Sequence, residues 1–287
     1  MQHQPLAEYQ VVSLAVNLPG PLTAAELLKL GASVTKVEPP SGDPMAQFAP
    51  AFYGSLTAGQ QVLNIDLKSE SGLAQLRGLL EQTDLLLTSS RPAALARLGL
   101  AWDDLHARYP RLLQVAIVGF PHPRQNEPGH DLTYQAGMGL LDPPHLPKAL
   151  IADVGGAQSA VVAAMGLLLA RERGQGTGYV EISLADAANY FAEPLRHGLT
   201  AESGVLGGGF AGYQLYETAD GWIAVAALEP AFWVGLQREL AIDDATQETL
   251  QTVFRTQTAA EWAEWANEHD LPIAVVQGTA CDRSCHG

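Results

Sequence analysis

The sequence contains very little cysteine, and both cysteines lie at its C-terminal end. Cys281 and Cys285 are the two cysteines in 287 residues. Proteins that depend on a disulfide framework carry many more, so such a framework is excluded, and a reducing, cytoplasmic location is expected. His286 follows Cys285, but one isolated tail motif of this kind does not define a metal site, and we predict no metal.

Positive charge is also scarce. Lys and Arg total 16 against 31 Asp and Glu, which gives a formal net charge of −15 at pH 7. Nucleic acid is therefore excluded as a partner, and an anionic ligand would need local donors to hold it against the overall charge. The hydrophobic content of 47% and the charged content of 16% are typical of a globular protein.

We expect neither a secretory leader nor a membrane span. The first nine residues are polar, unlike a signal peptide. The unbroken apolar run over residues 160–170 ends in Arg171, Glu172 and Arg173, and it is shorter than the roughly 20 residues that cross a bilayer. The run therefore predicts a buried helix, and no membrane partner is expected.

Apolar periodicity predicts alternating strands and helices over most of the chain. Strands are predicted over residues 9–16, 33–37, 62–67, 84–88, 112–118 and 179–183, with helices over 22–30, 69–82, 93–98, 102–108, the segment after Asp153, and 184–191. This order predicts an α/β fold with a Rossmann-like open parallel sheet. Ligands of such sheets bind beyond the carboxyl ends of the strands.

The sequence lacks the glycine-rich fingerprint of a dinucleotide site. The first predicted β-α turn, residues 17–20, holds a single glycine, so a standard NAD site is disfavoured. Glu38 nevertheless ends the second predicted strand, where a ribose-binding carboxylate would lie.

The pattern changes after about residue 196. Residues 204–212 hold five glycines, and a β-hairpin is predicted over 213–226 with Asp220-Gly221 in its turn. Helices over 231–240 and 259–268 and a strand over 271–276 follow. We predict a large Rossmann-like domain over residues 1–196, a glycine-rich linker over 197–212 and a small α+β domain over 213–287.

Three residues are candidates for acid–base chemistry, and each has a structural alternative. Asp153 lies at the mouth of a predicted helix and could cap it. His130 lies in a proline- and glycine-rich connection and could be an ordinary loop histidine. Glu229 precedes Pro230 at a helix start, where the helix dipole favours an acid. Asp131 and Asp142 are interpreted as helix caps.

Short motifs spread over the chain identify a family. They are Leu18-Pro19-Gly20-Pro21, Leu30-Gly31-Ala32-Ser33-Val34, Lys36-Val37-Glu38-Pro39-Pro40, Asn64-Ile65-Asp66-Leu67-Lys68, Arg91-Pro92, Arg97-Leu98-Gly99-Leu100, Tyr109-Pro110-Arg111-Leu112, Gly119-Phe120, Gly129-His130-Asp131, Asp153 with its helix, Ala219-Asp220-Gly221 and Leu228-Glu229-Pro230. Over roughly residues 10–276 the chain resembles the family III CoA-transferases, the CaiB/BaiF family, which includes the α-methylacyl-CoA racemases.

The resemblance implies specific roles. Asp153 would be the catalytic carboxylate, joined in the racemase branch by His130, with Glu229 supporting the histidine. All three are present, so the racemase branch is closest: an acyl-CoA racemase or epimerase that removes and returns the α-proton of a 2-methylacyl-CoA thioester. The alternative is a CoA-transferase that moves CoA between carboxylic acids through an aspartyl-CoA intermediate.

Further expectations concern the ligand and the assembly. CoA or acyl-CoA would be the substrate, with no tightly bound cofactor, and an interlocked homodimer is implied. We assign CoA contacts to Glu38, Arg91, Arg97, Gly155 and Gly156, with the N–H groups of residues 154–156 facing the enolate oxygen. The basic stretch that the family carries before residue 62 is here residues 56–61, which hold no cation. A non-catalytic member with impaired CoA binding is therefore a third hypothesis.

Overall fold

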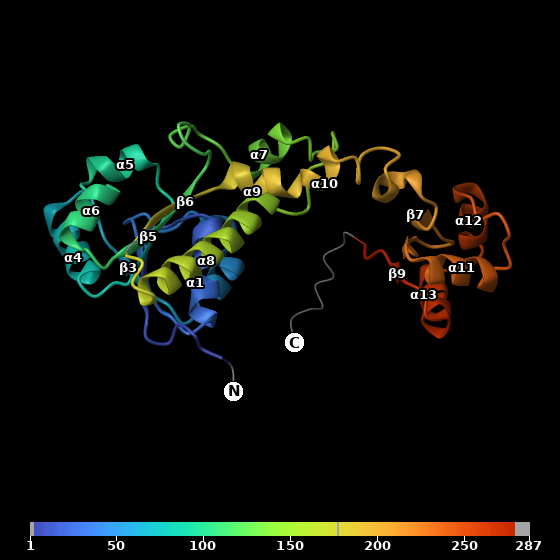
Figure 1. Ribbon diagram of the computed structural model, residues 1–287, viewed down its shortest axis with the longest axis horizontal. Helices are drawn as coiled ribbons and strands as arrows, with labels where there is room; N and C mark the ends of the chain where they lie inside the picture. The colour runs from blue at the N-terminus through green and yellow to red at the C-terminus, as the bar shows by residue number, and fades with distance from the viewer. Residues whose placement is uncertain (1–2, 177, 279–287) are drawn as a thin grey trace. The chain divides into compact units, whose positions relative to one another are not determined.

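The chain divides into two compact units in the computed structural model, which describes residues 3–176 and 178–278. Unit 1 spans Met1–Ala192 and unit 2 spans Glu193–Gly287. Figure 1 labels their helices and strands.

Unit 1 is built on a sheet of six parallel strands in the order β3-β2-β1-β4-β5-β6 (Figure 1). The predicted α/β class with an open parallel sheet is thus confirmed. The strand order reverses between β1 and β4, which opens a crevice at the carboxyl ends of these two strands. The strands are β1 (Gln10–Ser13), β2 (Ser33–Glu38), β3 (Gln61–Asn64), β4 (Leu85–Thr88), β5 (Leu113–Val118) and β6 (Tyr179–Ser183).

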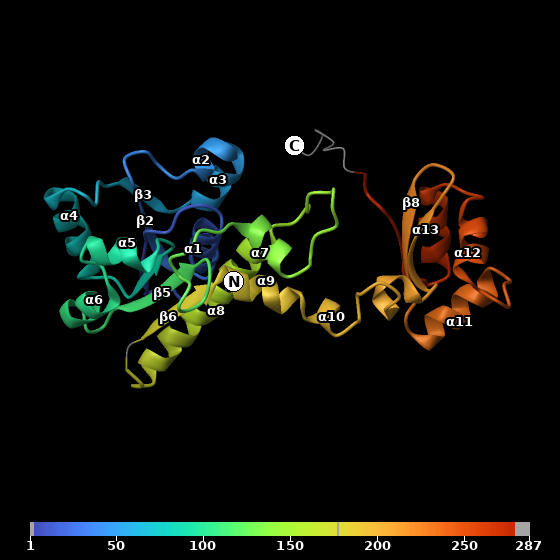
Figure 2. The same ribbon diagram turned by 90° about the horizontal axis from the view of Figure 1, so that it is seen from above.

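Two layers of helices cover this sheet (Figures 1 and 2). The helices α1 (Pro19–Lys29), α8 (Ile151–Glu172) and α9 (Leu184–Phe191) pack on one face, and α4 (Glu70–Leu80), α5 (Pro92–Arg97) and α6 (Trp102–Arg108) pack on the other. Three shorter helices complete the unit: α2 (Met45–Phe48), α3 (Pro50–Thr57) and α7 (Asp131–Gly137).

The sequence of β4 explains why both faces are covered. All four of its residues are buried. Successive strand side chains point to opposite faces, so Leu85 and Leu87 join the core beneath α1 and α8, while Leu86 joins the core beneath α4 to α6. A continuous apolar run of this kind is typical of a parallel strand buried on both faces.

The helix α8 begins earlier than the sequence suggested. Its N-cap is Leu150, and Asp153 lies in its first turn, so the placement of Asp153 at the helix mouth, where it could serve as a cap, is wrong. The helix has 22 residues and is long and apolar enough to cross a membrane by length and composition alone, but 44% of its apolar window is buried. It packs against α1, α9 and β5, as the core helix of a globular protein does.

Unit 2 has an antiparallel sheet in the order β7-β8-β9, covered on one face by helices. Tyr216, Ile223 and Ile273 from the strands pack against Phe254 and Trp262 from the helices. Its elements are α10 (Glu193–Arg196), a π-helical turn (Val205–Gly209), β7 (Tyr213–Glu217), β8 (Trp222–Ala226), α11 (Pro230–Glu239), α12 (Gln247–Phe254), α13 (Ala259–Glu268) and β9 (Ile273–Val275). The sequence did not predict α12.

Candidate active site

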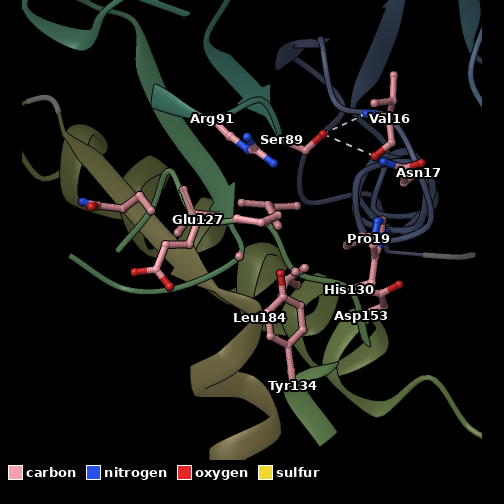
Figure 3. Close-up of a pocket in the computed structure, with 16 residues that line it drawn as sticks. Val16, Asn17, Pro19, Ser89, Arg91, Glu127, His130, Tyr134, Asp153 and Leu184 are labelled. Carbon is pink, nitrogen blue, oxygen red and sulfur yellow. Dashed lines mark hydrogen bonds between the residues drawn. The ribbon is translucent and has the colours of Figure 1, made fainter. Parts of the chain in front are cut away.

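A cavity of about 230 Å³ lies where β1, β4 and β5 end, at the crevice that the strand order creates (Figure 3). We call it the Asp153 cavity. Its lining comprises Val16, Asn17, Pro19, Ser89, Arg91, Ile117, Val118, Gly119, Gln125, Glu127, Pro128, Gly129, His130, Tyr134, Asp153 and Leu184. Two of the three predicted acid–base residues, His130 and Asp153, therefore share one cavity.

The His130 backbone is fixed at the start of α7. Its N–H donates to the Thr133 hydroxyl oxygen at 3.0 Å, and that hydroxyl donates to the His130 carbonyl oxygen at 2.8 Å. His130 is exposed and is one of the residues that line the cavity. The short helix thus presents an imidazole to the same space as the Asp153 carboxyl group.

Asp131 has a different role from the local cap that its position suggested. It is 4% exposed, and its Oδ1 accepts the backbone N–H of Asp153 at 3.0 Å. Its Oδ2 accepts from the Gln135 side-chain amide at 2.5 Å. The carboxylate at the start of α7 therefore satisfies an N–H of the first turn of α8, which the apolar side chain of the N-cap residue Leu150 cannot do.

The position of Asp153 changes its acidity. Burial, and secondly the nearby charge of Asp131, raise the pKa of Asp153 from 3.8 to about 7. Both causes disfavour the ionised form. A carboxyl group that titrates near neutral pH can take up a proton and return it at comparable cost, which is what a general acid–base needs.

Tyr134 is a cavity residue that the sequence reasoning missed. Burial, and then the charge of Asp153, raise the pKa of Tyr134 to about 12, so its hydroxyl stays protonated near neutral pH. It lies four residues after His130, in the first turn of the helix that His130 precedes, and this closeness in sequence could have identified it. In Figure 3 its ring stands upright beside Leu184 with the hydroxyl in the cavity.

The cavity lining also includes the guanidinium group of Arg91 and the hydroxyl group of Ser89. Arg91, predicted as a CoA contact, lines it from the residue before α5. Ser89 fixes the loop after β1, since its Oγ accepts the Val16 N–H at 2.9 Å and donates to the Val16 carbonyl oxygen at 3.3 Å (Figure 3). The ends of β1 and β4 are thereby held together at the crevice.

A second cavity of about 560 Å³ lies beside the first, at the carboxyl ends of β1, β2 and β4. Val16 lines both cavities, and the consecutive residues Ser89 and Ser90 line one each. Lys68 lines the second cavity and has no ion-pair partner within the described part of the chain. Lys68 ends the motif Asn64-Ile65-Asp66-Leu67-Lys68, for which the sequence predicted no ligand.

Glu38 lines the second cavity, but its carboxylate is committed to a buried network. It is 4% exposed, with Oε1 at 3.2 Å from the fully buried Lys36 ammonium and Oε2 accepting the Asp43 N–H at 3.1 Å. The Tyr53 hydroxyl also donates to it. Lys36 in turn pairs with Asp43 at 2.8 Å. Glu38 therefore helps to shape the cavity wall, and its direct contact with CoA stays a prediction.

The other three residues predicted to contact CoA line neither of the two cavities. Arg97 ends α5 and lines neither cavity, although its neighbour Leu98 lines the second one. Gly155 and Gly156 are buried in α8 and line neither cavity.

The two glycines allow α9 to pack closely on α8. A Cβ at Gly155 would lie 2.4 Å from the Phe191 ring, and one at Gly156 would lie 2.3 Å from the Leu184 side chain. The Val154 N–H donates to the Leu150 carbonyl oxygen at 2.9 Å, and the N–H groups that follow belong to the helix ladder. The N–H groups of residues 154–156 therefore do not face an enolate oxygen, contrary to the sequence prediction.

The third predicted acid–base residue lies in unit 2. Glu229 is the exposed N-cap residue of α11, and its partnership with His130 stays a prediction. The Cys281 and Cys285 tail lies outside the described residues. Within residues 3–176 and 178–278, no group of three or more His, Cys, Asp and Glu side chains is placed to hold a metal ion.

Comparison with known sequences identifies the family of this chain. The family model of CoA-transferase family III matches residues 6–281. The succinyl-CoA–D-citramalate CoA-transferase of Chloroflexus aurantiacus is 30% identical over 269 residues, which cover 84% of this chain and 67% of that one. The human α-methylacyl-CoA racemase is 28% identical, over 93% of this chain and 76% of its own.

Comparison with solved structures supports the fold. The crystal structure of the hypothetical protein Rv3272 of Mycobacterium tuberculosis matches with a TM-score of 0.85 and 23% identity, over 96% of this chain and 86% of that one. A family protein from Brucella suis matches with a TM-score of 0.81 and 22% identity, over 97% of this chain and 85% of that one.

Proposed function

The chain belongs to CoA-transferase family III, and from this premise we propose that it is an acyl-CoA racemase or epimerase acting on 2-methylacyl-CoA thioesters. The family contains both CoA-transferases and racemases of CoA thioesters. The observation that carries the finer choice is that His130 lines the same cavity as an Asp153 whose pKa is raised to about 7.

Two acid–base groups in one cavity suit inversion of a carbon centre. The proton α to a thioester is weakly acidic, so its removal needs a positioned base and stabilisation of the charge that develops on the carbonyl oxygen. One of the pair takes the proton from one face, and the other supplies a proton to the opposite face. His130 and Asp153 would exchange these roles for the two enantiomers, with Glu229 orienting the imidazole as the family resemblance implies.

The second cavity would hold the nucleotide end of CoA. It adjoins the Asp153 cavity at Val16 and at Ser89 and Ser90, so a long thioester could extend from one to the other. Lys68 would contact a phosphate group there, and Arg91 would contact the chain nearer the thioester. These cations would take the place of the basic stretch that residues 56–61 lack.

The CoA-transferase reaction is the alternative. It is favoured by the CoA-transferases among the relatives and by the same Asp153, which would attack the thioester carbonyl carbon as a nucleophile. The raised pKa weighs toward proton transfer, because a carboxyl group that is half protonated near pH 7 is less often available as a nucleophile.

One experiment separates these reactions. Purified protein is incubated with a single enantiomer of a 2-methylacyl-CoA in deuterated water, and α-deuterium incorporation is followed by mass spectrometry. We expect exchange in the wild type, a loss of about 100-fold or more in His130→Ala and Asp153→Asn, and full exchange in His145→Ala, a histidine 77% exposed on the connecting loop.

Other outcomes assign the other functions. A hydroxylamine-sensitive acyl or CoA adduct on Asp153 without α-proton exchange would favour the transferase reaction. A protein whose thermal unfolding does not respond to CoA or to any acyl-CoA would be a non-catalytic family member, and the proposal would then be wrong.

We also propose that the active assembly is a homodimer. The exposed side of α8 carries Val154, Val162 and Leu169, and α9 adds Tyr190 and Phe191; Val162 is 72% and Tyr190 is 75% exposed. Apolar side chains grouped in this way on a globular protein mark an interface, and the family resemblance suggests a second copy as the partner. A monomer at all concentrations in light scattering would refute this.

A further inference from the structure

We infer that Tyr134 is a further catalytic residue, whose hydroxyl donates a hydrogen bond to the thioester carbonyl oxygen as negative charge develops on it. This inference rests on the proposed function, because it concerns the same cavity and the same thioester. It also applies to either reaction of the family, since both place negative charge on that oxygen.

The reaction needs such a donor, and the backbone N–H groups at Asp153 and Val154 are occupied. The Asp153 N–H donates to Asp131 at 3.0 Å, and the Val154 N–H donates to Leu150 at 2.9 Å. Of the two hydroxyl groups that line the cavity, that of Ser89 already donates to the Val16 carbonyl oxygen. The Tyr134 hydroxyl, by contrast, has no hydrogen-bond partner among residues 3–176 and 178–278.

The ring of Tyr134 is held in place from several sides. Phe120 contacts it edge to face, with ring centroids 5.1 Å apart. A Cβ at Gly119 would lie 2.5 Å from the Tyr134 hydroxyl, and one at Gly129 would lie 2.5 Å from the ring. Both positions therefore need glycine for Tyr134 to stand where it does. A donor fixed in this way needs no rearrangement when charge appears, which is the condition for strong electrostatic stabilisation.

The hydroxyl also keeps its proton. Burial, and secondly the charge of Asp153, raise the pKa of Tyr134 to about 12, and Arg91 opposes them only in part. Asp131, also nearby, acts in the same direction as Asp153. Near neutral pH Tyr134 is therefore a neutral donor, unlike His130 and Asp153, which would exchange protons with the substrate.

The proton and electron changes are balanced without Tyr134 losing its proton. His130 or Asp153 takes the α-proton, the electron pair of the C–H bond becomes the enolate double bond, and the carbonyl π pair moves to the oxygen that Tyr134 contacts. Reprotonation on the other face reverses these shifts. In the transferase reaction, attack by Asp153 on the carbonyl carbon places the same charge on the same oxygen before the CoA thiolate leaves.

The test is Tyr134→Phe, which keeps the aromatic ring beside Gly119 and Gly129 and removes the hydroxyl. We expect kcat for α-proton exchange to fall about 100- to 1,000-fold, with KM within about threefold of the wild type and thermal unfolding unchanged. The control is Tyr109→Phe, which removes a hydroxyl that donates to the Arg77 carbonyl oxygen at 3.2 Å and lines neither cavity.

The outcomes separate this inference from the proposed function. Wild-type protein that neither exchanges the α-proton nor forms an adduct overturns both. An active wild type with an unchanged kcat in Tyr134→Phe overturns this inference alone. If Tyr134→Phe does not fold, Gly119→Ala decides instead, because its Cβ would displace the hydroxyl without removing it; a wild-type kcat in that variant overturns the inference.

Discussion

Replacement of Asp131 by Asn is expected to shift the pH dependence of proton abstraction by Asp153. The Oδ1 of an asparagine could still accept the Asp153 N–H, so the start of α8 would keep this hydrogen bond while the neighbouring negative charge disappears. The asparagine Nδ2 could not accept from the Gln135 amide, which would keep its bond to the Ala149 carbonyl oxygen. In the direction in which Asp153 removes the proton, the active form is the carboxylate. The kcat/KM of the enzyme in this direction should therefore fall as the pH drops through the pKa of Asp153, which is about 7 in the wild type.

The size of the shift follows from the two causes. Two unit charges about 6 Å apart interact by about 3 kcal/mol at an effective dielectric constant of about 20. Burial is the larger of the two causes, however, so Asp131 accounts for less than half of the rise in the pKa of Asp153 from 3.8 to about 7. We therefore expect the midpoint of the acidic limb to move down by about one pH unit, since one unit corresponds to about 1.4 kcal/mol.

The assay is initial-rate α-proton exchange with each enantiomer between pH 5 and pH 9, a range of about two units on either side of the midpoint. Groups facing Asp153 in the cavity, namely His130, Arg91 and Tyr134, are unchanged in the variant. The matched control is Asp142→Asn, the same loss of charge at a side chain 96% exposed on the connecting loop, which should leave the midpoint in place.

Two results would refute the reasoning. A midpoint near pH 7 in both Asp131→Asn and the wild type would mean that the Asp131 charge does not act on Asp153. A wild-type rate with no acidic limb down to pH 5, as expected for an exposed aspartate with a pKa of about 4, would mean that burial does not raise the pKa of Asp153.

Two further predictions concern stability and ligand affinity. Because the folded-state pKa of Asp153 lies above its unfolded value, the folded state binds more protons between about pH 4 and pH 7 and loses stability as the pH rises through that window. The pKa of Asp153 rises from 3.8 to about 7, so at pH 8 the free energy of unfolding of Asp153→Asn should exceed that of the wild type by up to about 4 kcal/mol, and the two should converge at pH 4. Equal stability at pH 8 in denaturant unfolding would contradict this. Lys68→Ala should weaken CoA binding about 5- to 20-fold in calorimetry, less at high salt, whereas Lys29→Ala, which removes the ion pair with Glu26, should not; an unchanged Kd for Lys68→Ala would remove Lys68 from the CoA site.

The strands of unit 1 could be predicted because their signal is local. The run Leu85-Leu86-Leu87 is apolar at every position, and the structure places it in the sheet within one residue of the predicted bounds, buried on both faces. The hairpin of unit 2 could also be predicted from the sequence, since Asp220-Gly221 occupies the turn between β7 and β8. Short-range patterns of this kind depend only on neighbours in the sequence.

The start of α8 could not be predicted in this way. The side chains of Ile151 and Ala152 cannot cap a helix, so the sequence predicted a helix start at Asp153. The structure starts the helix two residues earlier because Asp131, far back in the sequence, accepts an N–H of its first turn. The role of Gly155 and Gly156 was missed for the same reason, because the side chains they accommodate, Phe191 and Leu184, belong to α9.

The short helix α7 gives Asp153 its surroundings, although it has only seven residues. His130 precedes it and lines the cavity, Asp131 binds the start of α8, and Tyr134 places a hydroxyl in the cavity. Gln135 ties the two helices together, since its amide donates to Asp131 at 2.5 Å and to the Ala149 carbonyl oxygen at 3.0 Å. A displacement of α7 would therefore change the position, acidity and hydrogen-bonding environment of the reacting groups together. The geometry of the site thus depends on residues 130–135 as well as on Asp153.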